Sequence, residues 1–260
     1  MIPKKIHYCW FGGNSLSELA KKCIDSWKKF FPDYEIVEWN ESNFDVNCCQ
    51  YVKEAYEAKK WAFVSDYARF KILYENGGLY FDTDVEVIKA FDEVLDRGAF
   101  MGIESDKKGT VNPGLGLGVE VGSLFYKEML DFYHERKFFR DNREQDLTTI
   151  VEYTTNKLKV HGLIKTKKIQ NVCGIHIYPQ EYFSPKDIVS KKIKATKNTL
   201  TIHHFSGTWL NDEDKFYLEY MEKNKNKPFN LLVRKYARFK AIKRVRGFKV
   251  AIKETFKKLF

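Results

Sequence analysis

The stretch from Trp61 to Glu86, WAFVSDYARFKILYENGGLYFDTDVE, constrains the fold more than any other part of the sequence. Its first half places apolar residues at steps of three and four, which predicts a helix with a buried face. Gly77 and Gly78 predict the end of that helix, because glycine adopts the left-handed conformation that terminates helices. The apolar run 79–81 then predicts a short strand.

Two carboxylates, Asp82 and Asp84, follow this strand directly. Open α/β sheets bind ligands beyond the carboxyl ends of their strands, and residues two apart on a strand face the same side. We therefore expect both side chains to point at one cation or polar ligand. Such a pair suits Mg²⁺ or Mn²⁺, which neutralises a leaving diphosphate in group transfer. The spacing alone is unspecific, because Asp212 and Asp214 repeat it in a stretch typical of a solvated turn or helix start.

The rest of the pattern predicts alternating strands and helices. The expected strands cover residues 5–11, 34–38, 79–81, 85–88, 99–103, 175–178 and 200–205. The expected helices cover about residues 18–29, 48–59, 61–76, 123–136 and 146–157. The first helix follows a capping box formed by Ser15 and Glu18. This order is typical of a parallel, doubly wound sheet, so we expect one α/β domain over residues 1–222.

The positive charge of the chain is concentrated in its last part. The net charge is +10, yet residues 223–260 hold 14 lysine and arginine residues and one acid, which leaves residues 1–222 with a net charge of −3. From Phe229 on, apolar residues recur at steps of three and four, which predicts a basic amphipathic helical tail over residues 223–260. Such a helix lies in the interface of an anionic membrane surface. Alternatively, it packs on the body or on a partner with its lysines in solvent.

Composition and missing motifs exclude several classes. Five cysteines without a C-x-x-C pair indicate reduced thiols. The start shows no signal peptide and no run approaches about 18 apolar residues, so we expect a cytoplasmic protein. With the basic tail on an anionic membrane surface, we expect it to be peripheral at the inner face of the plasma membrane. The body lacks basic patches interleaved with aromatic residues, so no nucleic-acid partner is expected. P-loop, dinucleotide-binding, G-x-S-x-G and H-E-x-x-H patterns are also missing.

Other residues have both a functional and a structural interpretation. Asp66 and Arg69 lie three apart on the central helix and share a face, either within a site or as an exposed ion pair of little consequence. Trp10 ends the first strand, where its ring stacks on a nucleotide base or packs in the core. His203 and His204 lie on opposite faces at the end of a late strand, so one is a candidate metal ligand and either is also explained as structural.

Three segments together resemble one known family. SDYARFKILYENGGLYFDTD, IPKKIHYCWFGG and FPDYEIVEWN are similar to the DXD-containing sugar transferases of glycosyltransferase family 32. That family includes bacterial capsule and lipopolysaccharide transferases and is related to the clostridial toxin glucosyltransferases. The likeness covers about residues 1–90, with HHFSGTW as a later match. It implies a GT-A fold (a Rossmann-like mixed sheet flanked by helices), a nucleotide-sugar donor, Mn²⁺ or Mg²⁺, and retention of anomeric configuration.

The resemblance implies roles for the residues at matching positions. Trp10 stacks on the nucleotide base, and Asp66 and Arg69 bind hydroxyls of the donor sugar. Asp82 contacts the ribose or the sugar and helps to hold the metal, while Asp84 is the direct metal ligand.

Later residues also have implied roles. His204 is preferred over His203 as a further metal ligand, and Ser206 and Trp209 close over the diphosphate. The candidates for contacts with the sugar or the acceptor are Asn112, Glu144, Gln145 and Asp146.

These implications make the chain a hexosyltransferase that moves a sugar from a UDP-hexose or UDP-N-acetylhexosamine to a lipid-linked or cell-envelope glycan. No enzyme nucleophile is expected, because the acceptor hydroxyl attacks from the face of the leaving diphosphate while Arg69 stabilises the developing charge. A sugar trapped on Glu144 or Asp146 would indicate double displacement instead. Two alternatives stay open: an effector-type transferase that modifies a host protein, and a nucleotide-sugar-binding module without turnover.

Overall fold

The protein divides into two compact units in a computed structural model, which describes residues 1–141, 144–187, 190–207, 213, 216, 217, 220 and 231–257. The first unit comprises Met1–Lys186 and Ile193–His204, and the second comprises Asp187–Lys192 and Phe205–Phe260. The predicted domain boundary at 222/223 lies outside the described residues.

A mixed sheet forms the centre of the first unit. Its strands are β1 (Lys5–Cys9), β2 (Glu35–Trp39), β3 (Gly78–Tyr80), β5 (Phe100–Ser105), β6 (Thr110–Val111), β7 (Leu117–Val119), β8 (Gln170–Val172) and β9 (Ile175–Tyr178). Within the described residues they run in the order β2-β1-β3-β7-β5-β9-β8, with β6 beside β5. β1 is parallel to β2 and β3, and β5 is parallel to β9. The α/β class is therefore confirmed. A wholly parallel, doubly wound sheet is wrong, because β7 runs antiparallel between β3 and β5.

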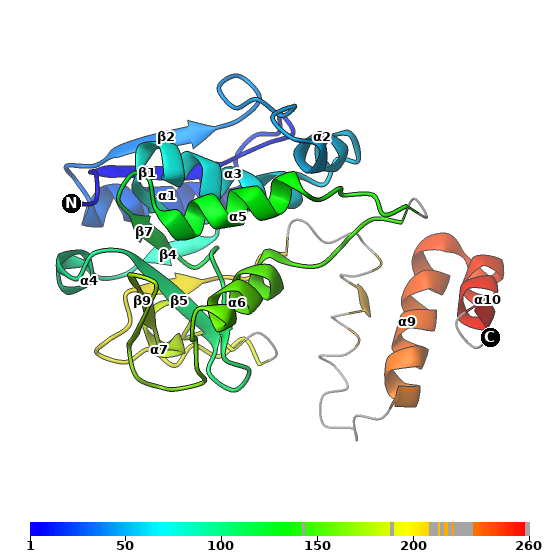
Figure 1. The fold of residues 1–260 in the computed structure, drawn as a ribbon. Helices are drawn as coiled ribbons and strands as arrows, with labels where there is room; N and C mark the ends of the chain where they lie inside the picture. The colour runs from blue at the N-terminus through cyan, green and yellow to red at the C-terminus, as the bar shows by residue number, and fades with distance from the viewer. Residues whose placement is uncertain are drawn as a thin grey trace. The chain divides into compact units, whose positions relative to one another are not determined.

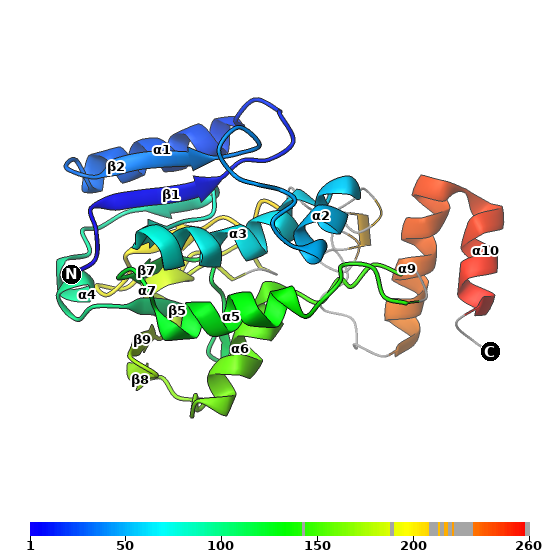
Figure 2. The same ribbon diagram turned by 45° about the horizontal axis from the view of Figure 1, so that its top comes forward.

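Helices cover both faces of this sheet (Figures 1 and 2). They are α1 (Glu18–Phe30), α2 (Gln50–Glu57), α3 (Trp61–Asn76), α4 (Asp92–Asp96), α5 (Leu124–His134), α6 (Ile150–Val160) and α7 (Gln180–Phe183). α1 lies on one face and α3 with α5 on the other, as Figure 2 shows. Strand alternation explains the two layers, because Ile6 and Tyr8 pack with Trp27 of α1, whereas Cys9 and Tyr80 pack with the α3 side.

Two elements differ in detail from the expected pattern. The capping box predicted at Ser15 is wrong, because α1 is capped by Ser17, whose hydroxyl accepts a hydrogen bond from Ala20 N at 3.1 Å. The strand expected after Asp84 exists as β4 (Val85–Val87), but it pairs antiparallel with β10 (Thr201–His203) in a separate two-stranded sheet. This pairing brings the late histidines to the D-x-D segment.

The connection from α3 to β3 is fixed by two glycines and a histidine. Gly77 and Gly78 both have positive φ, +61° and +98°, and a Cβ on Gly78 would lie 2.7 Å from Lys5 O. His7 Nδ1 accepts from Trp39 Nε1 at 3.1 Å, so Nε2 carries the proton and donates to Gly77 O at 3.0 Å. Burial lowers the pKa of His7 to about 4, which keeps the ring neutral.

The second unit contains two helices, α9 (Leu231–Arg246) and α10 (Phe248–Lys257). The expectation of one continuous tail helix is wrong, because Gly247 between them has φ +88° and interrupts it. The two helices contact each other, with ring centroids of Phe239 and Phe248 6.2 Å apart. None of the described helices is both long and apolar enough to cross a membrane.

Candidate active site

Arg69 joins the face of α3 to the end of β3. Its Nη2 lies 2.9 Å from Asp66 Oδ1, and its Nη1 lies 3.3 Å from Asp82 Oδ1. Its Nε donates to Ser65 O at 3.1 Å, which fixes the plane of the guanidinium. The exposed-ion-pair interpretation is wrong, because the Arg69 side chain is only 4% exposed, while that of Asp82 is 31% exposed. Only the Asp82 end of this cluster is therefore open to a ligand.

The charges of this cluster are unevenly balanced. Burial raises the pKa of Asp66 to about 7, against the opposing effects of Arg69 and of the Ile150 N–H, which donates to its carboxylate. Burial opposes the charged form of Arg69, but Asp82, Tyr80 and Asp66 outweigh it and raise the pKa of the guanidinium. One arginine thus faces two carboxylates, which leaves room for a further positive charge.

Asp82 is held in place by its own strand and by a glycine loop. Tyr80, two residues earlier on the same face of β3, donates from its hydroxyl to Asp82 Oδ1 at 3.2 Å, and its ring centroid lies 4.9 Å from Arg69 Cζ. Asp82 N donates to Gly114 O at 3.2 Å. A Cβ on Gly114 would lie 2.0 Å from Asp82 Oδ2, so any larger residue here would displace the Asp82 carboxylate.

Asn112 organises that loop. Its side-chain oxygen accepts from Gly114 N at 2.7 Å, and its amide nitrogen donates to Glu104 Oε1 at 2.9 Å. The structure therefore brings Asn112 to the site, in a buried position from which it shapes the loop beside Asp82.

Asp84 has a different partner from Asp82. The chain turns after Asp82, where Val85 N donates to Asp82 O at 2.9 Å, so strand alternation ends. The Asp84 carboxylate lies 2.9 Å from His203 Nε2. Burial opposes protonation of His203, but Asp84 and then Asp82 outweigh it and raise the pKa of the imidazole.

His204 lies on the other side of β10, as strand alternation requires. Its Nε2 is 2.8 Å from Glu86 Oε2, which also binds Lys22 Nζ at 2.9 Å. The preference for His204 as a metal ligand stays a prediction, and the geometry favours His203.

The donor set fits a hard divalent cation by its chemistry, with carboxylate oxygens from Asp82 and Asp84 and an imidazole beside them. Within the described ranges, no three His, Cys, Asp or Glu side chains form a group that could hold a metal ion. Proteins characteristically hold Mg²⁺ with one or two carboxylates, and waters and substrate phosphates complete its coordination. A site in which the phosphates of a ligand supply the remaining oxygens would therefore need only Asp82 and Asp84 from the protein.

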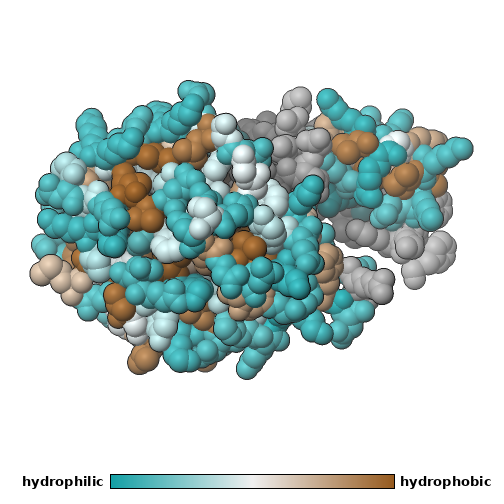
Figure 3. Space-filling view, turned by 90° about the horizontal axis from the view of Figure 1, so that it is seen from above, coloured by the Kyte–Doolittle hydropathy of each residue, from teal (hydrophilic) through white to brown (hydrophobic). Residues whose placement is uncertain are grey.

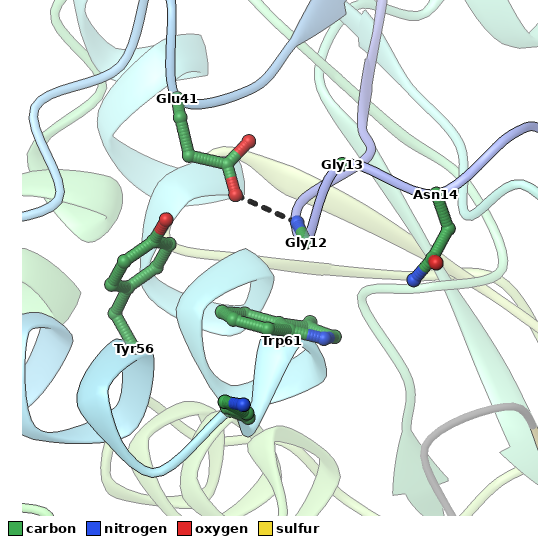
Figure 4. Close-up of a pocket in the computed structure, with 7 residues that line it drawn as sticks. Gly12, Gly13, Asn14, Glu41, Tyr56 and Trp61 are labelled. Carbon is green, nitrogen blue, oxygen red and sulfur yellow. Dashed lines mark hydrogen bonds between the residues drawn. The ribbon is translucent and has the colours of Figure 1, made fainter.

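A cavity of about 640 Å³ lies at the carboxyl ends of β1 and β2 (Figure 4). The lining residues are Gly12, Gly13, Asn14, Glu41, Tyr56, Lys59 and Trp61. Gly12 N donates to Glu41 Oε1 at 2.7 Å, and a Cβ on Gly12 would lie 2.6 Å from Trp61 Nε1. Trp10 precedes this loop, half-buried, and its Nε1 donates to Asn14 O at 2.6 Å.

The cavity and the carboxylate cluster lie along one face of α3. Trp61, Ser65 and Arg69 follow at steps of four, so they share that face. Eight residues of helix span about 12 Å, which is the length scale of a nucleoside diphosphate.

The remaining predicted residues are not in this cluster. Asp146 is buried in a separate network, where it accepts from Arg140 Nη2 at 3.0 Å, Tyr153 Oη at 2.9 Å and Thr148 Oγ1 at 2.7 Å. Glu144 and Gln145 belong to the same loop, through a Glu144 O contact with Arg140 N and a bridge to Phe139.

Two further predicted residues belong to the other part of the chain. Ser206 is exposed at the start of the second unit. Trp209 lies outside the described residues.

Comparison with known proteins bears on the same segment. Residues 17–101 match the family model described as "Glycosyltransferase sugar-binding region containing DXD motif". This range includes Asp66, Arg69, Asp82 and Asp84. Residues 17–101 are thus similar to a DXD-containing sugar-binding region. Its finer assignment to family 32 and to capsule or lipopolysaccharide synthesis stays a prediction.

Two curated relatives are named as transferases. An uncharacterized glycosyltransferase of Acanthamoeba polyphaga mimivirus is 25% identical over 74% of this chain and 76% of its own length. Inositol phosphoceramide mannosyltransferase 3 of Schizosaccharomyces pombe is 31% identical over a match that covers 38% of this chain and 29% of that relative.

Two solved structures are also similar. PaToxG glycosyltransferase matches with a TM-score of 0.48 and 20% identity, covering 61% of this chain and 69% of that one. The galactosyltransferase LgtC, in complex with donor and acceptor sugar analogs, matches with a TM-score of 0.36 and 13% identity, covering 88% and 99%. Both scores lie below 0.5, so the fold assignment rests on the strand order of the sheet.

Sequence reasoning missed three residues around the cluster, and it preferred His204 although His203 is the histidine beside Asp84. Tyr80 could have been found from its place two residues before Asp82 on a strand. His203 could have been found by alternation only once the register of β10 on β4 was known. Nothing in the local pattern indicated that Gly114 and Glu104 would meet at Asp82 and Asn112.

Proposed function

We propose that this chain is a metal-assisted, retaining hexosyltransferase. Its donor is a UDP-hexose or UDP-N-acetylhexosamine, and its acceptor is a lipid-linked or cell-envelope glycan. The observation that carries the proposal is the cluster at the end of β3, where one buried arginine faces two carboxylates and one of them, Asp82, is partly exposed. The matched family description and the names of both curated relatives support a sugar transferase.

The donor lies along α3 in this proposal. Its base occupies the cavity at Gly12 and Gly13, beside Trp10, and its sugar lies about two helical turns away at the exposed Asp82 end of the cluster, with Arg69 and Asp66 behind Asp82. Arg69 is held by Ser65 O and Asp66, so it does not need to reorganise when the donor binds.

The diphosphate meets the carboxylate pair. Asp82 and Asp84 would hold Mn²⁺ or Mg²⁺, which supplies charge neutralisation for the leaving nucleoside diphosphate. His203 orients the Asp84 carboxylate by its contact at 2.9 Å. Gly114 lets the loop backbone lie against Asp82, which excludes water from one side of that carboxylate.

The sugar is transferred without a covalent enzyme intermediate in this proposal. Asp146 is one of the two residues on which a trapped sugar would indicate double displacement. Burial opposes its ionisation, but hydrogen bonds from Thr148, Arg140 and Tyr153 outweigh burial and lower its pKa and its nucleophilicity. The acceptor hydroxyl therefore attacks from the side of the departing diphosphate. A lipid acceptor is supported by the name of the yeast relative, which specifies inositol phosphoceramide.

The test is a donor-hydrolysis screen. The full chain is mixed with UDP-glucose, UDP-galactose, their N-acetyl forms or GDP-mannose, with Mn²⁺ or with a chelator. We expect UDP release from one UDP-sugar that is lost with chelator and in Asp84→Asn, but kept in Asp33→Asn, which changes an exposed carboxylate on another turn. Neither hydrolysis nor calorimetric binding of any donor would refute the transferase assignment.

A further inference from the structure

The described tail combines a high positive charge with exposed apolar side chains. Residues 231–257 hold ten lysine and arginine residues and one acid, hence a net charge of +9. That acid, Glu254, lies 3.8 Å from Arg246 Nη1, and Glu213, from outside this range, lies 2.9 Å from Arg246 Nε and 3.8 Å from Arg238 Nε, so both acids pair with arginines of α9. Figure 3 shows apolar side chains surrounded by hydrophilic ones on this part of the molecule.

α10 divides its surface into two sides. Ala251 is fully buried, while Phe248 is 54% and Ile252 is 38% exposed one turn apart on the same helical face. Lys249 and Lys253 follow each of them by one position, so a row of exposed lysines flanks the exposed apolar pair.

Two residues at the end of α9 extend this surface. Val245 is 46% exposed, and Lys243 Nζ lies 5.1 Å from the ring centroid of Phe248. We call Lys243, Val245, Phe248, Lys249, Ile252 and Lys253 the basic–apolar face.

We propose that the basic–apolar face docks on an anionic membrane surface, such as the inner face of the plasma membrane. Phe248 and Ile252 enter the boundary between headgroups and acyl chains, and the flanking lysines extend to the anionic headgroups. The docking is interfacial, consistent with the absence of a membrane-spanning helix among the described ones. It does not depend on the proposed transferase activity, because binding requires no donor.

Other occupants satisfy only part of this face. A nucleic acid would pair its phosphates with the lysines but would leave Phe248 and Ile252 in water. A second copy of the chain would bury the apolar pair but would place two tails of net charge +9 against each other. An anionic lipid surface satisfies both the charge and the apolar side chains.

The test measures flotation of the full chain with vesicles of phosphatidylcholine, alone or mixed with phosphatidylglycerol, at low and high salt. We expect binding only to the mixed vesicles, weakened by salt. Phe248→Ser with Ile252→Ser is expected to weaken it roughly tenfold. Lys249→Glu with Lys253→Glu is expected to weaken it by at least roughly twentyfold.

Matched controls separate this face from general surface effects. Leu124→Ser changes an apolar residue on α5 that is 83% exposed, and Lys107→Glu with Lys108→Glu makes the same charge change on the first unit. Both should bind as the unchanged chain does, and circular dichroism shows whether each variant keeps its helices.

Three outcomes would overturn the proposal. They are equal binding to neutral and anionic vesicles, undiminished binding of the two tail variants, and a loss in the controls as large as in those variants. Self-association or duplex-DNA binding that depends on Phe248 and Ile252, without vesicle binding, would also refute it. Donor hydrolysis is measured without vesicles, so a failure here leaves the transferase proposal unaffected.

Discussion

Two arginine–carboxylate clusters in the first unit contain the same residue types but differ in exposure and in hydrogen bonding. At the end of β3, Arg69 serves both Asp66 and Asp82, and the Asp82 side chain is 31% exposed. In the loop before α6, the Asp146 carboxylate accepts hydrogen bonds from Arg140, Thr148 and Tyr153. Arg136 Nη2 also lies 3.6 Å from Asp146 Oδ2. The first cluster has more negative groups than partners and is open, whereas the second is saturated. A partly exposed carboxylate that shares its cation with another acid indicates a ligand site better than burial or ion pairing alone.

The largest expected effect comes from removing the one cation of the open cluster. Arg69→Met leaves Asp66 and Asp82 without their shared partner, so we expect donor hydrolysis to fall on the order of a thousandfold. The unfolding free energy should fall by about 3–5 kcal/mol, because a buried carboxylate loses its counter-charge. Urea unfolding and hydrolysis assays measure both, and Arg69→Lys should recover part of the stability. Hydrolysis within tenfold of the unchanged chain in folded Arg69→Met would contradict the assignment.

The next prediction tests whether hydrolysis requires the Asp82 carboxylate to stay in its position beside Gly114. Gly114→Ala places a Cβ 2.0 Å from Asp82 Oδ2. Displacement of that carboxylate by about 1 Å is expected to reduce hydrolysis about a hundredfold. Gly174→Ala is the control, because its added Cβ meets nothing within 4 Å although its φ is +83°. It should lose some stability but no activity. Equal loss of activity in both variants would show that the contact of the added Cβ with Asp82 is not the cause.

The saturated cluster should respond in the opposite way. Asp146→Asn weakens its contacts with Arg140, Tyr153 and Thr148, which we expect to lower the unfolding free energy by about 1–3 kcal/mol. Donor hydrolysis by the folded variant should stay unchanged, because the side-chain hydrogen bonds of Asp146 go to Arg140, Thr148 and Tyr153 and not to Arg69 or Asp82. Denaturation and steady-state assays provide the comparison. A large loss of hydrolysis at intact stability, or a sugar trapped on Asp146, would make this cluster catalytic.

The last comparison between the two clusters is in the pH dependence of stability. Burial raises the pKa of Asp66 to about 7. Between about pH 4 and about pH 7 the folded chain therefore keeps a proton that the unfolded chain has lost. The contribution of Asp66 to the unfolding free energy is complete below about pH 4 and falls as pH rises to about 7.

Asp146 should show the reverse sign. Burial opposes its ionisation, but the hydrogen bonds from Thr148, Arg140 and Tyr153 outweigh it and lower its pKa. Its contribution is present above about pH 4 and is lost as pH falls further. As pH rises from about 4 to about 7, the unfolding free energy of the unchanged chain should fall relative to that of Asp66→Asn. As pH falls below about 4, it should fall relative to that of Asp146→Asn. If both differences changed over the same pH range, the contrast between the clusters would be refuted.

The sequence predicted those parts of the open cluster whose residues lie close together in the chain. Asp66 and Arg69 share a helical face by spacing, the glycine pair ends α3, and Asp82 follows a three-residue strand, so one 26-residue stretch encodes most of the site. The structure corrects one step of that reasoning. Strand alternation predicted one direction for Asp82 and Asp84, but the chain turns between them and gives each a different partner.

Contacts between distant segments were not predictable from spacing. The register of β10 on β4 decides that His203 and not His204 meets Asp84, and a one-residue shift would have exchanged them. The fit of Gly114 against Asp82 depends on β7 entering the sheet antiparallel beside β3. In the tail, the apolar periodicity continues through Gly247, so the pattern alone favoured one helix where the backbone forms two.

Binding of Mn²⁺ by the end of β3 is the most direct test of the central claim. Electron paramagnetic resonance of Mn²⁺ measures the free ion while the full chain is titrated, with and without UDP, for the unchanged chain and for Asp84→Asn. The account predicts one bound ion per chain that requires both UDP and Asp84, because the carboxylates need phosphate oxygens to complete the site. Equal Mn²⁺ binding by Asp84→Asn, or none by the unchanged chain with UDP, would contradict it.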